Sequence, residues 1–141
     1  MRIATFADID EVSTMANKFI SLTEYKHHYD AGVLEDVLIT LLKLPPEEGI
    51  VLIEDNKGMI LGRTSTFAFG NKKMAVEFGW WVDPDARKEG VGKQLIEAFE
   101  YWAKKIQCDL VVMVSIDDEV GKYYEKIGYK LIERMYMKEL N

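Results

Sequence analysis

Residues 74–116 restrict the fold of this chain more than any other segment, because they combine two strand patterns with a helix pattern between them. Residues 74–82 are mostly apolar, and residues 91–106 repeat apolar side chains at the spacing of an amphipathic helix. Residues 110–116 are apolar on both faces, which is typical of a central strand beside a parallel neighbour. A strand–helix–strand unit of this kind forms a right-handed crossover that places its two strands side by side. We therefore expect a fold that contains both helices and a partly parallel sheet.

The patterns on either side of this unit predict the remaining elements. Asp8 and Glu11 have the spacing of a capping box at the start of a helix, and Pro45-Pro46 would end a second helix. The other expected elements are strands at residues 2–6, 49–54, 59–69 and 129–137 and helices at residues 9–19, 33–42 and 118–127. The order β-α-α-β-β-β-α-β-α-β predicts an α/β (α+β mixed) fold, with a central mixed sheet of about six strands and helices on both faces. The 141 residues fit one domain, 1–141.

Composition argues against several classes of protein. A net charge of −6 disfavours a broad nucleic-acid-binding surface, and no apolar segment approaches the length of a membrane span. The N-terminus lacks the apolar region of a secretory signal, and a single cysteine, Cys108, suits the reducing cytoplasm. Cys108 is best interpreted as a small apolar filler, and no His/Cys spacing predicts a metal site. We expect a cytoplasmic protein without a bound metal.

The turn inside the strand–helix–strand unit, DPDARKEGVGKQL, has the composition of an anion-binding site. The start of a helix offers unpaired backbone N–H groups and a partial positive charge. Gly90 and Gly92 have no Cβ, so a ligand could approach those N–H groups closely. Arg87, Lys88 and Lys93 add positive charge around them. Together these features predict a phosphate site.

Two common phosphate-binding fingerprints do not match this turn. The dinucleotide fingerprint requires a third glycine where Leu95 stands. The nucleotide P-loop requires glycine at the position of Arg87 and serine or threonine at the position of Gln94. The pattern [Q/R]-x-x-G-x-[G/A] does match, as Arg87-Lys88-Glu89-Gly90-Val91-Gly92.

With this motif the chain resembles the GNAT N-acetyltransferase superfamily, in which the segment cradles the pyrophosphate of acetyl-CoA. A second stretch, Asp118-Glu-Val-Gly-Lys-Tyr-Tyr124-Glu-Lys-Ile-Gly-Tyr129, is similar to the family pattern N-x-x-A-x-x-[F/L]-Y-E-K-x-G-[F/Y]. Asp118 replaces the usual asparagine, and Gly121 replaces the usual alanine. The specific motifs lie within residues 76–129, whereas the first seventy residues match the family only by the order of their elements.

The resemblance implies that acetyl-CoA is a co-substrate and that backbone groups hold it. Its pyrophosphate would bind the N–H groups of residues 88–93, and its pantetheine arm would pair with the strand edge at Trp81 and Val82 and contact Asp118. We expect a bulge or kink at Gly79 that frees this edge. The implied cofactor-binding residues are Trp81, Val82, Arg87, Lys88, Glu89, Gly90, Val91, Gly92, Lys93 and Asp118.

The resemblance also implies two catalytic side chains. Tyr124 would be the general acid that protonates the departing thiolate, since a phenol stays protonated at pH 7. Glu77 interrupts an apolar strand and is the best candidate for the base that deprotonates the amine. The alternatives are that Tyr124 is an ordinary packing aromatic, and that Glu77 faces solvent or pairs with Arg63. His27 or His28 could also act as the base, although two histidines in a polar loop are more often solvated.

Three functions compete on these observations. The leading hypothesis is an acetyl-CoA-dependent N-acetyltransferase that acts on a primary amine of a small molecule or a protein. The alternative is a CoA-binding module without catalysis. An enzyme that acetylates aminoacyl-tRNA is disfavoured by the net charge of −6. The amine acceptor is not identified, and the exposed edge of a terminal strand offers a route to a homodimer.

Overall fold

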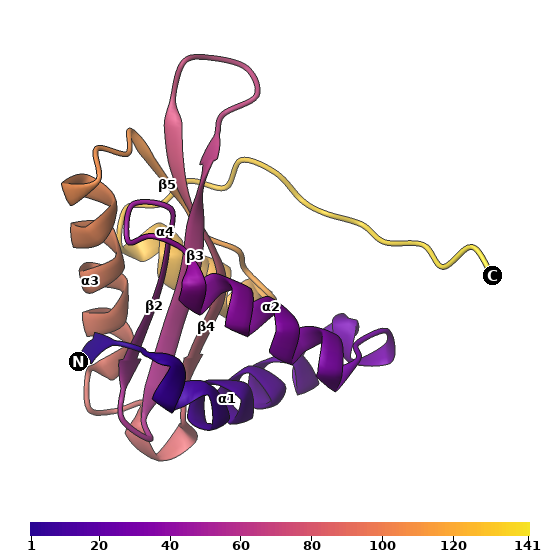
Figure 1. Ribbon diagram of the computed structural model, residues 1–141. Helices are drawn as coiled ribbons and strands as arrows, with labels where there is room; N and C mark the ends of the chain where they lie inside the picture. The colour runs from indigo at the N-terminus through magenta and orange to yellow at the C-terminus, as the bar shows by residue number, and fades with distance from the viewer.

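The computed structural model describes residues 1–141 and contains a five-stranded sheet in the order β1-β2-β3-β4-β5 (Figure 1). The strands are β1 (Arg2–Ile3), β2 (Gly49–Glu54), β3 (Gly58–Thr66), β4 (Lys73–Val82) and β5 (Leu110–Val112). The first four strands pair antiparallel, and β4 pairs parallel with β5. The prediction of a mixed sheet in which β4 lies next to β5 is therefore confirmed, although the sheet has one strand fewer than expected.

Helices cover both faces of this sheet, as predicted. Helices α1 (Ile9–Ser21) and α2 (Ala31–Lys43) pack on one face, and α3 (Val91–Lys105) packs on the other with α4 (Asp118–Lys126). Each face has its own apolar core, which we name the α1/α2 core and the α3/α4 core. None of the helices combines the length and the apolar character that crossing a membrane requires.

The N-terminal turn differs from the prediction. Residues 2–6 do not form one strand, because β1 ends at Ile3 and a short 3-10 helix occupies Phe6–Asp8. The carboxylate of Asp8 accepts hydrogen bonds from Arg2 Nη1 at 2.8 Å and from the Thr5 N–H at 2.7 Å, and not from α1. The predicted capping box with Glu11 is therefore wrong. The guanidinium of Arg2 takes up the Asp8 side chain and holds the pKa of that carboxyl well below its usual range.

Strand β4 contains a bulge at the position expected from Gly79. Leu61 of β3 lies opposite Gly79 and the next residue, Gly62, lies opposite Glu77, so Phe78 has no partner on β3. The extra residue shifts the alternation of side chains by one position. Ala75 and Trp80 consequently reach the same α3/α4 core although they are an odd number of positions apart, whereas Trp81 packs in the α1/α2 core. Trp80 and Trp81 therefore lie on opposite faces of the sheet.

Strands β4 and β5 pair over only part of their length. Met74, Ala75 and Val76 lie opposite β5, and no strand covers the same edge of β4 from residue 77 to residue 82. β5 was expected over residues 110–116 but ends at Val112. The two strands therefore part just where the bulge begins, so that the edge of β4 beyond Val76 has no strand partner.

The expected last strand at residues 129–137 is wrong. Residues 130–141, which we name the C-terminal arm, contain no helix or strand and form no backbone–backbone hydrogen bond. Figure 1 shows this segment in yellow, leaving the body of the molecule in an extended course. An apolar pattern favours a strand only where a neighbouring strand offers hydrogen bonds, and the chain places none beside these residues.

Candidate active site

The turn between β4 and α3 presents free backbone N–H groups at the start of a helix. Gly90 has a φ of +79°, a left-handed conformation that glycine adopts without steric cost, and its carbonyl accepts the first bond of α3 from the Gln94 N–H at 3.1 Å. No side chain caps α3. The N–H groups without a protein partner are those of Lys88, Gly90, Val91, Gly92 and Lys93. Backbone N–H groups without a protein partner are therefore present at the turn for which the sequence predicted a phosphate site.

Two details of this turn correct the prediction. The N–H of Glu89 is not free, because it donates to the carbonyl of Ala86 at 3.1 Å. Gly92 serves helix packing, since a Cβ there would lie 3.0 Å from Trp80 Cζ2 and 3.3 Å from Val82 Cγ2. A Cβ at Gly90 would meet no atom within 4 Å. Gly90 is therefore the glycine required by backbone conformation, and Gly92 is the one required for contact between α3 and β4.

The basic side chains of the turn have different roles. Arg87 folds back onto the protein, where its Nε donates to the carbonyl of Val82 at 3.1 Å and its guanidinium lies 5.3 Å from the centroid of a Trp81 ring. Arg87 thus braces the end of β4 and occupies a carbonyl that was expected to pair with the pantetheine arm. Lys93 lies 3.7 Å from Glu97 in an ion pair. Lys88 is exposed and has neither an ion-pair nor a hydrogen-bond partner.

Two of the three acidic side chains of the turn are also paired, and the third, Asp85, is exposed without an ion pair. Glu89 contacts Lys57 at 3.3 Å, and Asp83 contacts Lys18 at 3.0 Å. These pairs reduce the negative charge that would face an anion at the start of α3. The positive end of α3 and the ammonium of Lys88 therefore add positive charge locally, on a chain whose net charge is −6.

Glu77 lies at the point where β4 and β5 diverge. Its side chain is 1% exposed, and its Oε2 accepts a hydrogen bond from the Val114 N–H at 2.9 Å. Burial raises the pKa of Glu77 to about 7, although hydrogen bonds from the N–H groups of Val114 and Gly79 act in the opposite direction. Neither sequence alternative is found, since Glu77 does not face solvent and Arg63 lies opposite Val76 without an ion pair to Glu77.

Tyr124 reaches the same part of the backbone from α4. Its side chain is buried, and its Oη donates to the carbonyl of Val114 at 3.2 Å. Burial, and next the negative charge of Glu77, raise the pKa of Tyr124 above the usual range of a phenol, so Tyr124 is protonated at neutral pH. The two predicted catalytic side chains are thus brought together on one residue, Val114, which sequence analysis did not single out because its role depends only on its backbone.

An aromatic cluster surrounds the Tyr124 ring. Trp80 stacks on Tyr123 with ring centroids 5.7 Å apart, and Tyr124 lies 5.7 Å from Trp80 and 5.8 Å from Tyr129. The buried indole Nε1 of Trp80 and the buried Oη of Tyr129 have no hydrogen-bond partner. Buried donors are rarely left unpaired in native proteins, so these two atoms are exceptions within the cluster.

Asp118 lies at the first residue of α4, where it is exposed and forms no side-chain hydrogen bond. The neighbouring Asp117 caps α4 instead, by accepting from the Val120 N–H at 2.8 Å. Gly121 faces Ser115, because a Cβ at Gly121 would lie 3.2 Å from Ser115 Oγ. The glycine at this position therefore allows α4 to pack closely on the chain that follows β5.

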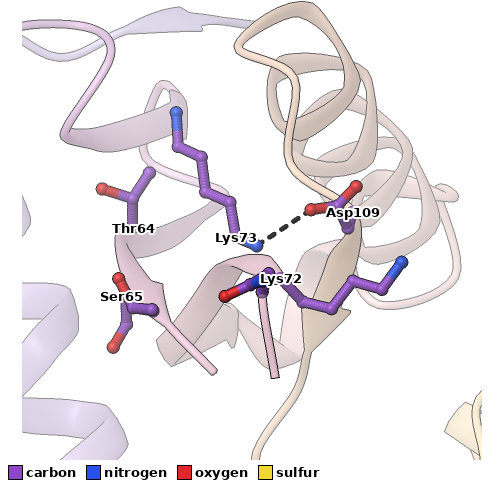
Figure 2. A pocket seen from close by; sticks show the side chains of 7 residues that line it. Thr64, Ser65, Lys72, Lys73 and Asp109 are labelled. Carbon is purple, nitrogen blue, oxygen red and sulfur yellow. Dashed lines mark hydrogen bonds between the residues drawn. The ribbon is translucent and has the colours of Figure 1, made fainter. Parts of the chain in front are cut away.

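The remaining candidates lie elsewhere. His27 is exposed and 3.7 Å from Glu24, and His28 is also exposed in the same loop. No group of three or more His, Cys, Asp or Glu side chains is placed to hold a metal ion. An open cavity of about 450 Å³ is lined only by polar and charged residues, but it lies at the β3–β4 hairpin beside Asp109, at the end of β4 remote from the start of α3 (Figure 2).

A second open groove, of about 280 Å³, lies between α2 and the bulge of β4. Phe78, which the bulge turns toward α2, lines it together with Val33 and Val37, and Asp36 and Arg63 contribute opposite charges. Sequence analysis did not single out Phe78, because its position depends on the register between β3 and β4.

Comparison with known proteins identifies the family of this arrangement. The sequence profile described as "Acetyltransferase (GNAT) family" matches residues 13–129. A search of curated proteins finds no match. Similar solved structures include the aminoglycoside 6'-N-acetyltransferase AAC(6')-IG from Acinetobacter haemolyticus, with 18% identity over 99% of this chain and 98% of that chain and a TM-score of 0.74.

Two further solved structures have the same fold. AAC(6')-Iy in complex with the bisubstrate analogue CoA-S-monomethyl-acetylneamine is 17% identical over 99% of this chain and 96% of that chain, with a TM-score of 0.72. A protein from Bacillus halodurans C-125 described as a transcriptional regulator is 18% identical over 99% of this chain and 97% of that chain, with a TM-score of 0.77.

Proposed function

Because the chain belongs to the GNAT family of acetyltransferases, we propose that it transfers the acetyl group of acetyl-CoA to a primary amine of a small molecule or a protein. The observation that carries this proposal is the row of unpaired N–H groups at the start of α3, next to the uncovered edge of β4. These two features place an anion site next to a strand edge that no other strand covers. A ligand with a diphosphate and an amide-containing arm requires both.

The donor site consists mainly of backbone. The N–H groups of Gly90, Val91 and Gly92 would hold the diphosphate, and Lys88 would add a charge at the rim. The edge of β4 from residue 77 to residue 82, which no strand covers, would pair with the amides of the pantetheine arm, apart from the Val82 carbonyl that Arg87 occupies and the Gly79 N–H that donates to Glu77. Trp80 Nε1 is a further donor without a partner.

We propose that Glu77 is the base and Tyr124 the acid of the transfer. The amine nitrogen forms a bond to the thioester carbonyl carbon and its proton passes to the Glu77 carboxylate, directly or through a water molecule. The carbon–sulfur bond then breaks, and the thiolate takes a proton from Tyr124 Oη. A carboxylate whose pKa is about 7 is a much better base at neutral pH than an ordinary glutamate.

The two side chains would act in sequence because the charge of Glu77 affects Tyr124. While Glu77 is ionised, its charge opposes ionisation of the Tyr124 hydroxyl. When Glu77 takes the proton of the amine, this repulsion disappears and Tyr124 becomes a stronger acid. Proton uptake at the base would therefore prepare the acid for the step in which the thiolate leaves.

The groove between α2 and the bulge supports an acceptor site on the face opposite α3. Phe78, Val33 and Val37 would contact the apolar part of the acceptor. Phe78 is the bulged residue of β4 and directly follows Glu77 in the sequence. Donor and acceptor would then approach the part of β4 that β5 does not cover from the α3 side and the α2 side of the sheet.

Binding and turnover can be tested separately. We expect CoA and acetyl-CoA to raise the melting temperature of the protein, and we expect free thiol to be released from acetyl-CoA in the presence of a suitable member of an amine panel. The absence of a shift with either ligand would refute the donor site. A shift without thiol release from any amine would favour the alternative function, a CoA-binding module without catalysis.

A further inference from the structure

One carboxylate lies inside the very turn that offers free N–H groups to an anion. Glu89 stands between Lys88 and Gly90, directly before the start of α3, and its side chain is half-exposed. The positive end of a helix attracts negative charge, and an acidic side chain near a helix start can accept hydrogen bonds from the free N–H groups there. Glu89 therefore has the charge and the position to compete with an anionic ligand for these groups.

The structure shows that Glu89 does not occupy the start of α3. No side chain caps this helix, and Glu89 Oε2 lies instead 3.3 Å from Lys57 Nζ. Lys57 belongs to the turn between β2 and β3, which is distant from Glu89 in the sequence. A residue outside the β4–α3 turn thus decides where the charge of Glu89 is placed.

The β2–β3 turn is itself fixed against the donor site. The N–H of Asp83, which follows β4, donates to the carbonyl of Lys57 at 2.7 Å. A Cβ at Gly58 would lie 2.8 Å from the Trp81 carbonyl oxygen and 3.0 Å from Leu95 Cδ1, so this turn lies directly against β4 and α3. The ammonium of Lys57 therefore reaches Glu89 from a backbone that hydrogen bonding and close packing hold in place.

We propose that Lys57 is a positioning residue of the donor site, which keeps the Glu89 carboxylate at the β2–β3 turn and so leaves the N–H groups at the start of α3 free for an anionic ligand. This inference rests on the proposed function, in which those groups bind the diphosphate of CoA. Without Lys57, the Glu89 side chain would lose its ion-pair partner and would accept from the N–H groups of α3. The chain would then cap its own anion site.

An ordinary surface ion pair would behave differently. Such a pair contributes little to stability, and the loss of either partner has a similar small effect. In the proposed arrangement the two residues act in opposite directions on ligand binding. Loss of Lys57 closes the anion site, whereas loss of the Glu89 charge leaves it open, and the effect of losing Lys57 depends on the presence of Glu89.

Titration calorimetry with CoA tests this dependence on the wild type, Lys57→Met, Glu89→Gln and the double variant. Lys57→Met should weaken CoA binding about 3- to 10-fold, the effect of competition by a typical helix cap. Glu89→Gln should bind CoA at least as tightly as the wild type, and adding Lys57→Met to it should cost less than about 2-fold. Lys105→Met, which removes the same charge at the last residue of α3, is the matched control and should bind normally.

Amide hydrogen exchange followed by NMR detects the cap without any ligand. In Lys57→Met the N–H groups of Gly92 and Lys93 should exchange at least about 3-fold more slowly than in the wild type, because Glu89 accepts from them. The double variant should exchange nearly as fast as the wild type, since a neutral amide is a weaker acceptor than a carboxylate. Loss of a merely structural ion pair would leave these N–H groups as fast as before, or faster.

Each result supports or overturns the inference. Equal losses of CoA affinity on removing Lys57 with and without the Glu89 charge would overturn it, because Lys57 would then act through its own charge alone. Unchanged exchange at Gly92 and Lys93 in Lys57→Met would overturn it as well. A wild type that does not bind CoA would refute the proposed donor site, while slowed exchange in Lys57→Met would still support the placement of Glu89 by Lys57.

Discussion

Glu77 and Tyr124 bind the two polar backbone groups of one residue: Glu77 Oε2 accepts from the Val114 N–H at 2.9 Å, and Tyr124 Oη donates to the Val114 carbonyl at 3.2 Å. The proposed base comes from the bulged strand β4 and the proposed acid from helix α4. Val114 therefore fixes the relative position of two side chains that are 47 positions apart in the sequence. This relationship is the structural basis of the predictions on both residues.

Replacement of Tyr124 by phenylalanine should slow acetyl transfer and leave CoA binding nearly unchanged. The ring and its packing on Trp80 are kept, but the hydroxyl that would protonate the thiolate is lost. Loss of a general acid typically lowers kcat by about 100-fold or more. Tyr123→Phe, which removes the hydroxyl of the neighbouring ring, is the control and should keep its rate. A Tyr124→Phe enzyme with a normal rate would exclude this residue as the acid.

Glu77 should make the folded protein less stable as the pH rises. Its pKa is raised from 4.5 to about 7, so the folded state binds the proton more tightly than the unfolded state does. The stabilisation is complete below pH 4.5 and is lost as the pH rises through about 7, by an amount on the order of 3 kcal/mol. Glu77→Gln should remove this contribution to the slope of the free energy of unfolding against pH, which urea unfolding at pH 5 and pH 8 measures. An unchanged slope would show that Glu77 does not titrate in this range; Glu119→Gln, on the exposed side of α4, is the control.

The rate of acetyl transfer should depend on the same ionisation, in the opposite sense. Only ionised Glu77 can accept the proton of the amine, so kcat/KM should rise with pH and level off above about 7. Glu77→Gln should lower the rate and abolish this rise. If the profile of Glu77→Gln keeps the same inflection, another group, such as His27 or a water chain, is the base.

Gly90→Ala should destabilise the protein by about 1–2 kcal/mol, because alanine at a φ of +79° brings its Cβ too close to its own backbone. No neighbouring atom would clash with the new methyl group, so the loss should come from backbone strain alone. Gly90→Asn should be milder, since asparagine tolerates the left-handed region. Thermal melts of the three proteins measure the order, and equal stability of the alanine and asparagine variants would contradict it.

Lys88→Ala should weaken CoA binding roughly 2- to 5-fold at low salt, the effect of one exposed charge. The difference from the wild type should shrink as the ionic strength rises, because salt screens exposed charges. Lys105→Ala, at the last residue of the same helix, is the control and should bind CoA normally. Equal losses in the two variants would indicate a general effect of net charge. Titration calorimetry with CoA at two salt concentrations makes the comparison.

Phe78→Ala should raise the KM for the amine acceptor more than the KM for acetyl-CoA. The ring lines the groove beside α2, while the backbone of β4 that would face the donor is unchanged. Val37→Ala, on the opposite wall of the groove, should have the same selectivity. Equal effects on both substrates would argue that the groove is not the acceptor site.

Much of the local structure follows from the sequence. The helical periodicity of residues 91–106, the apolar strand before it and the glycines between them predicted β4, the turn and α3 with small errors in their bounds. These features depend on sterics and on hydrogen bonds between residues close in sequence, so a short segment contains the information. The divergence of the sheet beside Gly79 was predictable for the same reason, since a glycine inside a strand often marks a bulge.

Other features depend on contacts between segments far apart, and no local pattern encodes them. Asp8 binds Arg2 in place of capping α1, and Arg87 binds the Val82 carbonyl in place of extending toward a ligand. Each of these side chains had two acceptable partners, and the packed structure decided between them.

The sequence by itself determined the order of elements, the free N–H groups at the start of α3 and the family to which they belong. Only the tertiary structure decided that Glu77 is buried, that Val114 joins it to Tyr124 and that residues 129–137 form no strand within the single chain. The physical reason is that residues close in sequence decide whether the backbone N–H groups at a helix start find hydrogen-bond partners. A strand, in contrast, exists only where another segment supplies its hydrogen bonds, and burial of a carboxylate depends on everything that packs around it.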